Sequence, residues 1–228
     1  MTEPSPTLPP LTGPEVPPAS GGPAAQLVIL LHGVGVDGSD LIELAPFFAA
    51  VLPDAAFVAP DAPEPFDLAP FGRQWFSLQD RSGPAISAAL RATAPRLDAY
   101  IEQQLTHWGV GNGDLALVGF SQGAMMALHV GLRRAKSPAA LISLSGALVD
   151  AASLASEITV RPPVLLIHGE QDEVVNPASL ATAEQALAAV GVPVLAQMQP
   201  GLGHGIDESS ARLAQAFLAQ TFECPVST

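Results

Sequence analysis

Short apolar runs alternate with longer amphipathic segments along most of the chain. The runs have the length of β-strands and occupy residues 26–32, 55–59, 114–120, 139–145, 163–168 and 192–198. Strands that are apolar at nearly every position are typical of a sheet buried on both faces. The segments between them repeat apolar residues at helical spacing, as in Leu97, Ile101 and Leu105. This alternation predicts an α/β fold with a mostly parallel central sheet and helices on both faces.

Several helix ends are marked by residues with special backbone preferences. Asn176 and Pro177 are predicted to be the N-cap and first residue of one helix, which Gly191 closes. Pro95 is predicted to start or kink the helix that contains Leu97, because proline lacks the N–H that an interior helical position donates.

The first 25 residues differ in composition from the rest of the chain. They hold eight of its 23 prolines and no basic residue, so we expect a flexible, extended segment that is not a signal peptide. Residues 26–228 are predicted to form one domain, too small to include a large cap domain. The charge-free stretches 16–36 and 115–132 are interrupted by glycines, prolines or polar residues, and no membrane span is predicted.

The balance of charge excludes two classes of partner. The 228 residues carry a formal net charge of −13, whereas nucleic acids and anionic membranes are bound by basic surfaces. The single cysteine, Cys224, excludes an internal disulfide and a metal site built from cysteines. It fits a reducing compartment, so we expect a cytoplasmic protein.

The strongest chemical signal is the sequence Gly119-Phe-Ser-Gln-Gly123. It lies where a predicted buried strand passes into a predicted helix, the setting in which G-x-S-x-G displays a nucleophilic serine at a sharp turn. Glycines two residues before and after Ser121 remove side chains that would clash in such a turn. An ordinary glycine-rich turn is the alternative, and the context favours Ser121 as a nucleophile.

A serine hydroxyl needs a base, and the base needs an acid to orient it. His204 lies on a glycine-rich loop after the last predicted strand, and Asp172 follows the fifth strand. The chain order Ser121, Asp172, His204 is that of the α/β-hydrolases. Asp150 is the alternative acid. The other four histidines lie in predicted helices or at strand ends (His32, His107, His129 and His168).

An oxyanion hole is expected after the first predicted core strand. Glycines on either side of Val34 allow backbone N–H groups to approach a substrate oxygen. The two donors are predicted to be the N–H groups of Val34 and of Gln122, the residue after the nucleophile. A phosphate-binding loop is the alternative, but no lysine follows and no G-x-G-x-x-G is completed.

Seven motifs over residues 26–222 occur in the order found in the small carboxylesterase family, which includes the acyl-protein thioesterases and bacterial phospholipase/carboxylesterase homologues. They are LLHGVG, VLPDAAFVAPDAP, RQWFSL, GFSQGAMMAL, LSG, HGEQDEVV and GHGI. The chain resembles this family. The resemblance implies a minimal α/β-hydrolase that cleaves carboxylic esters or thioesters without cofactor or metal, with Trp75 and Val174 lining the acyl site.

These observations together predict a serine carboxylesterase that forms an acyl-enzyme intermediate. Its substrate is expected to be a small-molecule acyl ester, with thioesters and lysophospholipids as further candidates. Two alternatives remain open: an acyltransferase using the same three residues, and a non-catalytic binding protein of the hydrolase fold. The sequence does not indicate an oligomeric state.

Overall fold

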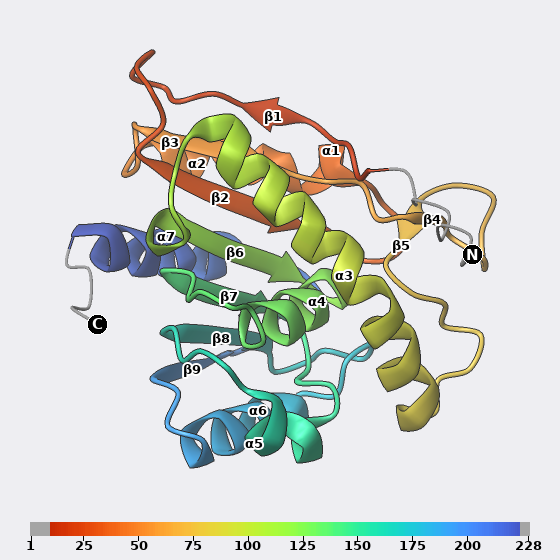
Figure 1. Ribbon diagram of the computed structural model, residues 1–228. Coiled ribbons are helices and arrows are strands. Elements are labelled where there is room, and N and C mark those ends of the chain that lie inside the picture. Colours follow the sequence, from red (N-terminus) through yellow and green to blue (C-terminus); the bar gives the residue numbers. More distant parts are fainter. Residues whose placement is uncertain (1–9, 224–228) are drawn as a thin grey trace, which may run out of the picture.

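The computed structural model describes residues 10–223, and its centre is a seven-stranded sheet (Figure 1). The strand order is β1-β3-β2-β6-β7-β8-β9, with β1 antiparallel to β3 and every other neighbouring pair parallel. The bounds are β1 Glu15–Val16, β2 Gln26–Leu31, β3 Ala55–Val58, β6 Leu115–Phe120, β7 Ala140–Leu144, β8 Val164–Gly169 and β9 Val194–Gln199. All six predicted strands are present and mutually parallel, as the alternation of apolar runs predicts.

Helices cover both faces of this sheet (Figure 1). Their bounds are α1 Gly38–Leu41, α2 Ala45–Ala49, α3 Gly83–Trp108, α4 Gln122–Gly131, α5 Leu154–Glu157, α6 Ala178–Ala189 and α7 Glu208–Glu223. Short 3-10 turns occupy residues 42–44, 112–114 and 151–153, and a small hairpin joins β4 (Glu64–Pro65) to β5 (Arg73–Gln74). Within residues 10–223 these connections form no separate cap domain.

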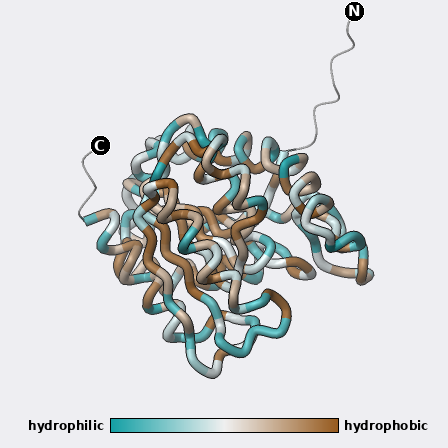
Figure 2. The backbone as a smooth tube through the Cα atoms, turned by 90° about the horizontal axis from the view of Figure 1, so that it is seen from below, coloured by the Kyte–Doolittle hydropathy of each residue, from teal (hydrophilic) through white to brown (hydrophobic). Residues whose placement is uncertain are grey.

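Alternate residues of each central strand enter two different apolar cores. In β2, Leu27 and Ile29 belong to the core that includes residues of α3, α4 and α6, whereas Val28 and Leu30 belong to the core that includes residues of α1, α2 and α7. All four side chains are fully buried. In Figure 2 long hydrophobic stretches of the backbone run through the middle of the molecule. Because both faces are covered, the strands can be apolar at successive positions.

Helix α3 continues through Pro95, from Gly83 to Trp108. The prediction that Pro95 starts this helix was therefore wrong. Leu90 and Leu97, on either side of the proline, are both fully buried in the core. Burial of this long apolar stripe outweighs the hydrogen bond that a proline removes from a helix interior.

The sequence predicts a flexible segment over residues 1–25, but residues 10–25 pack against the domain in the structure. Strand β1 lies within it and pairs with β3, and the Leu11 side chain is only 7% exposed. Backbone N–H groups of Ala59 and Asp61 donate to the carbonyls of Pro14 and Thr12, at 3.0 and 2.8 Å. Prolines are tolerated here because an edge strand needs only one row of hydrogen bonds. Residues 1–9 and Cys224 lie outside the described residues.

No helix in the described part of the chain is long and apolar enough to cross a bilayer. The charge-free stretches 16–36 and 115–132 each contain a strand together with loops or a short helix.

The docking of the N-terminal segment can be tested with one leucine. We expect Leu11→Ala to lower the free energy of unfolding by about 2 kcal/mol, because it leaves a cavity under a buried side chain. Urea denaturation monitored by tryptophan fluorescence measures this. Leu68→Ala is the matched control, since Leu68 is 52% exposed and its loss leaves no buried cavity. Equal stability of the two variants would mean that residue 11 does not pack on the domain.

Candidate active site

Four segments that follow parallel strands bring the predicted site residues together at one edge of the sheet. Val34 follows β2, Ser121 follows β6, Asp172 follows β8 and His204 follows β9. In a parallel sheet the carboxyl ends of all strands lie at the same edge, which is where α/β proteins place their sites.

The turn at Ser121 is strained. Its φ of 53° and ψ of −117° put a residue with a side chain in a conformation that rarely forms outside tight turns. A Cβ on Gly119 would lie 2.4 Å from the Gly123 carbonyl oxygen, and a Cβ on Gly123 would lie 2.0 Å from the Leu31 carbonyl oxygen. Only glycines fit at these two positions. The motif therefore has the geometry that its sequence predicts.

Ser121, His204 and Asp172 form a continuous chain of hydrogen bonds. His204 Nε2 lies 3.0 Å from Ser121 Oγ, and His204 Nδ1 lies 2.7 Å from Asp172 Oδ2. The other carboxylate oxygen of Asp172 accepts the N–H groups of Val174 and Val175, at 2.8 and 2.9 Å. With Asp172 ionised, Nδ1 carries the proton of neutral His204 and Nε2 is free to accept the serine proton.

The Asp172 carboxyl is held as a carboxylate although its side chain is fully buried. Burial alone would raise its pKa, but hydrogen bonds from His204 and from the Val175 and Val174 N–H groups outweigh burial and lower the pKa below its ordinary value. A buried carboxylate beside a histidine stabilises the imidazolium that forms when the histidine takes up a proton.

Two further side chains support this group, and neither is predicted from the sequence to do so. His168 is buried, with Nε2 2.9 Å from the Val175 carbonyl oxygen and 3.2 Å from Asp172 Oδ2. The ring of Phe120 lies 4.9 Å from that of His204, centroid to centroid. The spacing of four residues between His168 and Asp172, at the end of a strand, is the signal in the sequence that could have indicated the first contact.

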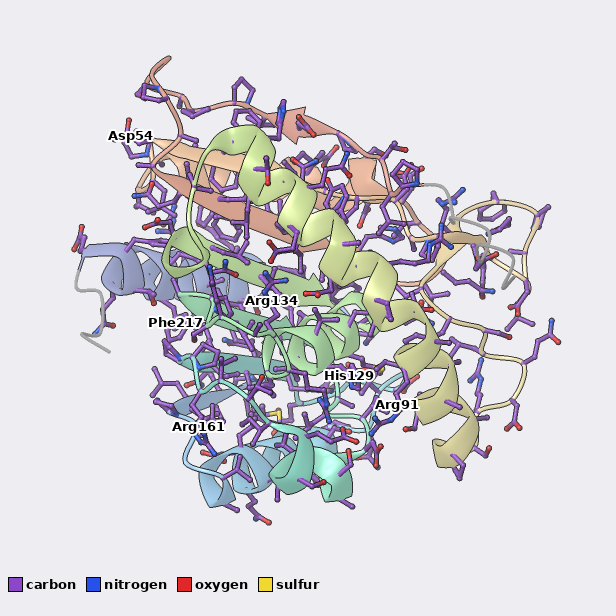
Figure 3. The ribbon with its side chains drawn as sticks, in the orientation of Figure 1. Asp54, Arg91, His129, Arg134, Arg161 and Phe217 are labelled. Carbon is purple, nitrogen blue, oxygen red and sulfur yellow. The ribbon has the colours of Figure 1, made fainter. Side chains whose placement is uncertain are left out.

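Asp150, the alternative acid, lies in a separate ion-pair network. It accepts hydrogen bonds from Arg91 at 2.5 Å and from Ser87 at 3.0 Å, and Arg91 also pairs with Glu157 at 2.9 Å. In Figure 3 Arg91 extends from α3 toward α5. The hydrogen bonds from Arg91 and Ser87 lower the pKa of Asp150, which makes no hydrogen bond to His204. The structure thus places Asp172, not Asp150, next to His204.

The predicted oxyanion donors flank the serine. Gly33, which precedes Val34, is so close that a Cβ on it would lie 3.4 Å from Ser121 Cβ. Gln122 is the first residue of α4. Within residues 10–223 neither the Val34 nor the Gln122 N–H has a hydrogen-bond partner. Free N–H groups at a helix start can stabilise developing negative charge.

Trp75 and Val174, assigned to the acyl site by the resemblance, have very different surroundings. Val174 is 69% exposed and lies two residues after Asp172. Trp75 is fully buried, and its indole N–H donates to the His32 carbonyl oxygen at 2.9 Å. Trp75 is thus enclosed within the domain, where its hydrogen bonds hold it, whereas Val174 is open to solvent.

The remaining histidines do not approach Ser121 as His204 does. His107 is on the surface of α3, and His129 is buried in α4 close to Arg91 (Figure 3). Burial, together with repulsion from the nearby Arg133 and Arg91, lowers the pKa of His129 to about 4. In the described part of the chain no group of three or more His, Cys, Asp or Glu side chains is arranged to hold a metal ion.

This sheet, with a strained serine turn between β6 and α4, defines the chain as an α/β-hydrolase. The sequence profile of the Phospholipase/Carboxylesterase family matches residues 14–222. The chain therefore belongs to the phospholipase/carboxylesterase family, and it is an ester hydrolase.

Similar proteins agree with this assignment. The chain is 34% identical over 199 residues to Esterase YpfH of Escherichia coli (strain K12), covering 87% of this chain and 84% of the relative. It is 25% identical over 208 residues to Acyl-protein thioesterase 1 of Gibberella zeae, covering 84% and 88%. The crystal structure of esterase PE8 superposes with a TM-score of 0.90 and 42% identity, covering 93% of this chain and 99% of that one.

The choice between the two acids gives a direct prediction. We expect Asp172→Asn to lower kcat by about 10⁴-fold, because an amide no longer fixes the Nδ1–H tautomer of His204 or stabilises its cation. Asp150→Asn is the matched control and should stay within about twofold of the wild type, since asparagine tolerates the left-handed φ of 57° at that position. Steady-state kinetics on a p-nitrophenyl ester compares them. A larger loss in Asp150→Asn would reverse the assignment.

His129 should make the protein less stable in mild acid. Its pKa of about 4 in the folded protein lies below the ordinary value of 6.5, so the unfolded chain binds more protons between these pH values. Stability contributed by neutral His129 is therefore lost as the pH falls from 6.5 to about 4.

We expect His129→Gln to reduce the slope of unfolding free energy against pH in this range, by at most about 1.4 kcal/mol per pH unit. Urea denaturation at a series of pH values gives the slope. Gln103→Ala, at an exposed position of α3 that does not titrate, is the control and should keep the wild-type slope. An unchanged slope in His129→Gln would show that His129 is not held neutral.

Proposed function

We propose that this ester hydrolase is a serine carboxylesterase in which Ser121 forms an acyl-enzyme. The observation that supports this most is the hydrogen-bonded series from Ser121 through His204 to Asp172, with distances of 3.0 and 2.7 Å. The strained turn at Ser121 adds support, because such strain is typical of a displayed nucleophile. A binding protein without activity would not need all three groups in this order.

The proposed reaction has two halves. Ser121 Oγ attacks the ester carbonyl carbon as its proton passes to His204 Nε2, and the carbonyl oxygen becomes an oxyanion held by the N–H groups of Val34 and Gln122. The tetrahedral intermediate expels the alcohol, which takes the proton from Nε2. A water molecule then attacks the acyl-enzyme by the same route and releases the acid. Asp172 stabilises the His204 cation in both halves.

Exposed apolar side chains on the loops that carry the candidate site residues support an acyl substrate. Val174 lies two residues after Asp172 and Val36 two residues after Val34, and the Gly35 N–H donates to the carbonyl of Arg73, two residues after Phe71, at 2.8 Å. Val36, Phe71 and Val174 are exposed hydrophobic side chains. Thioesters and lysophospholipids are included in the proposed substrate class, and a cytoplasmic location is part of the proposal because the only cysteine cannot form an internal disulfide.

Labelling with a fluorophosphonate tests the nucleophile. We expect one covalent adduct on Ser121, located by peptide mass spectrometry, and loss of both labelling and esterase activity in Ser121→Ala. Ser145→Ala is a matched control, since Ser145 is also buried with a positive φ, 49°, yet should keep full labelling. An adduct on any other serine would overturn the assignment.

Substrate class is tested separately. A series of p-nitrophenyl esters and acyl thioesters of increasing chain length, with a lysophospholipid, gives kcat/KM for each. Added alcohol distinguishes hydrolysis from acyl transfer: a hydrolase continues to release mainly the free acid, whereas an acyltransferase would form mainly the new ester.

A further inference from the structure

The two donors of the proposed oxyanion hole come from separate parts of the chain. Val34 lies in the loop after β2, and Gln122 begins α4. An oxyanion hole is effective only when both donors lie at about 2.7–3.1 Å from the developing oxyanion. If Ser121 acts as in the proposed function, on which this inference rests, a connection within the protein must keep the two segments in register.

His32 sets the orientation of the peptide group that carries the first donor. Its Nε2 accepts the Ala62 N–H at 2.9 Å, so the proton of the neutral ring is on Nδ1, which donates to the Gly33 carbonyl oxygen at 2.6 Å. Burial lowers the pKa of His32 and keeps the ring neutral. In a trans peptide the N–H points opposite to the C=O. With the Gly33 carbonyl held by His32, the Val34 N–H points away from His32.

Trp75 links His32 to the segment that carries the second donor. Its indole N–H donates to the His32 carbonyl oxygen at 2.9 Å, and its backbone N–H donates to Gln122 Oε1 at 2.7 Å. The Gln122 side chain also donates through Nε2 to the Phe76 carbonyl oxygen at 2.7 Å. Thr93 of α3 donates to the Trp75 carbonyl oxygen at 2.9 Å, which fixes the middle of this connection.

The side chains of His32, Trp75 and Gln122 are buried. His32 and Trp75 are fully buried and Gln122 is 2% exposed, with the rings of His32 and Trp75 5.7 Å apart. None of them is placed to contact a substrate through its side chain. Hydrogen bonds of this kind are strong and directional in a dry environment, and losing one partner leaves the other unsatisfied.

We propose that Trp75, acting through the His32 carbonyl and the Gln122 side chain, is a positioning residue that holds the two oxyanion donors in register. His32 is its partner on the Val34 side. Trp75 thereby contributes to stabilising the transition state, whereas its contribution to binding the ground-state ester is small.

The chain offers a matched pair of variants, since it contains two tryptophans. Trp75→Phe removes the indole N–H that holds His32 and keeps the backbone N–H that holds Gln122. Trp108→Phe removes an indole N–H that is buried and has no hydrogen-bond partner within the described residues. Rates are expressed per active site, counted by exhaustive titration with a fluorophosphonate, so that a loss of folded protein does not count as a loss of kcat.

For Trp75→Phe we expect kcat on p-nitrophenyl butyrate to fall about 10- to 100-fold, with KM within about twofold of the wild type. A trifluoromethyl ketone, whose serine adduct places an oxyanion in the same hole, should bind more weakly by a factor similar to the loss in kcat/KM. Trp108→Phe should leave all three quantities unchanged. Unchanged kcat per site in Trp75→Phe, or a lower kcat with unchanged ketone binding, would overturn the proposal.

If Trp75→Phe does not fold, replacing Trp75 with 3-benzothienylalanine keeps the shape of the ring system and removes only the N–H. The same losses are expected, and wild-type rates would refute the proposal. Labelling of the wild-type protein with the fluorophosphonate separates this test from that of the proposed function. If Ser121 is not labelled in the wild type, the acyl-enzyme itself is refuted. If the wild type is labelled and the Trp75 variant is fully active, only the positioning role is refuted.

Discussion

The contact between the first turn of α4 and the carboxyl end of β2 is the constraint on which the site depends. Gly123 packs so closely on the Leu31 carbonyl that no side chain fits between them. This contact requires the chain to turn sharply at Ser121, and it brings the start of α4 next to the loop that carries Val34. The strained backbone at Ser121 is stable because buried apolar side chains on both faces of the sheet fix β2, β6 and α4.

Much of the fold and the order of the candidate site residues could be predicted from the sequence. Strands buried on both faces leave continuous apolar runs, and turns that need glycine leave glycines at fixed spacing. Helix ends were predicted to within about a residue for the same reason. Asn176 Oδ1 accepts the Ala178 N–H at 2.9 Å, α6 begins at Ala178 rather than at the predicted Pro177, and Gly191 has a left-handed φ of 77°. Each of these signals depends on a few neighbouring residues, so it can be recognised in a short stretch of sequence.

The features that the sequence did not indicate depend on distant contacts. Trp75 is buried because His32 and Gln122, 43 and 47 residues away, supply its hydrogen-bond partners. Helix α3 continues through Pro95 because burying apolar residues on both sides of the proline stabilises the helix more than the lost hydrogen bond destabilises it. A local sequence pattern does not indicate which loop will cover which side chain. Contacts between residues far apart in the sequence are known only from the folded structure.

The edge strand β1 has a consequence for how the chain tolerates shortening. All four side chains of β3 are buried, and β1 is the neighbour on its outer side. Truncation that removed β1 would uncover a row of backbone N–H and C=O groups flanked by apolar side chains, which is the kind of edge that pairs with other chains and aggregates. Strand β1 therefore covers the outer edge of β3 and leaves less of that edge open to pairing with another chain. Within residues 10–223, β9 is the strand at the opposite edge of the sheet.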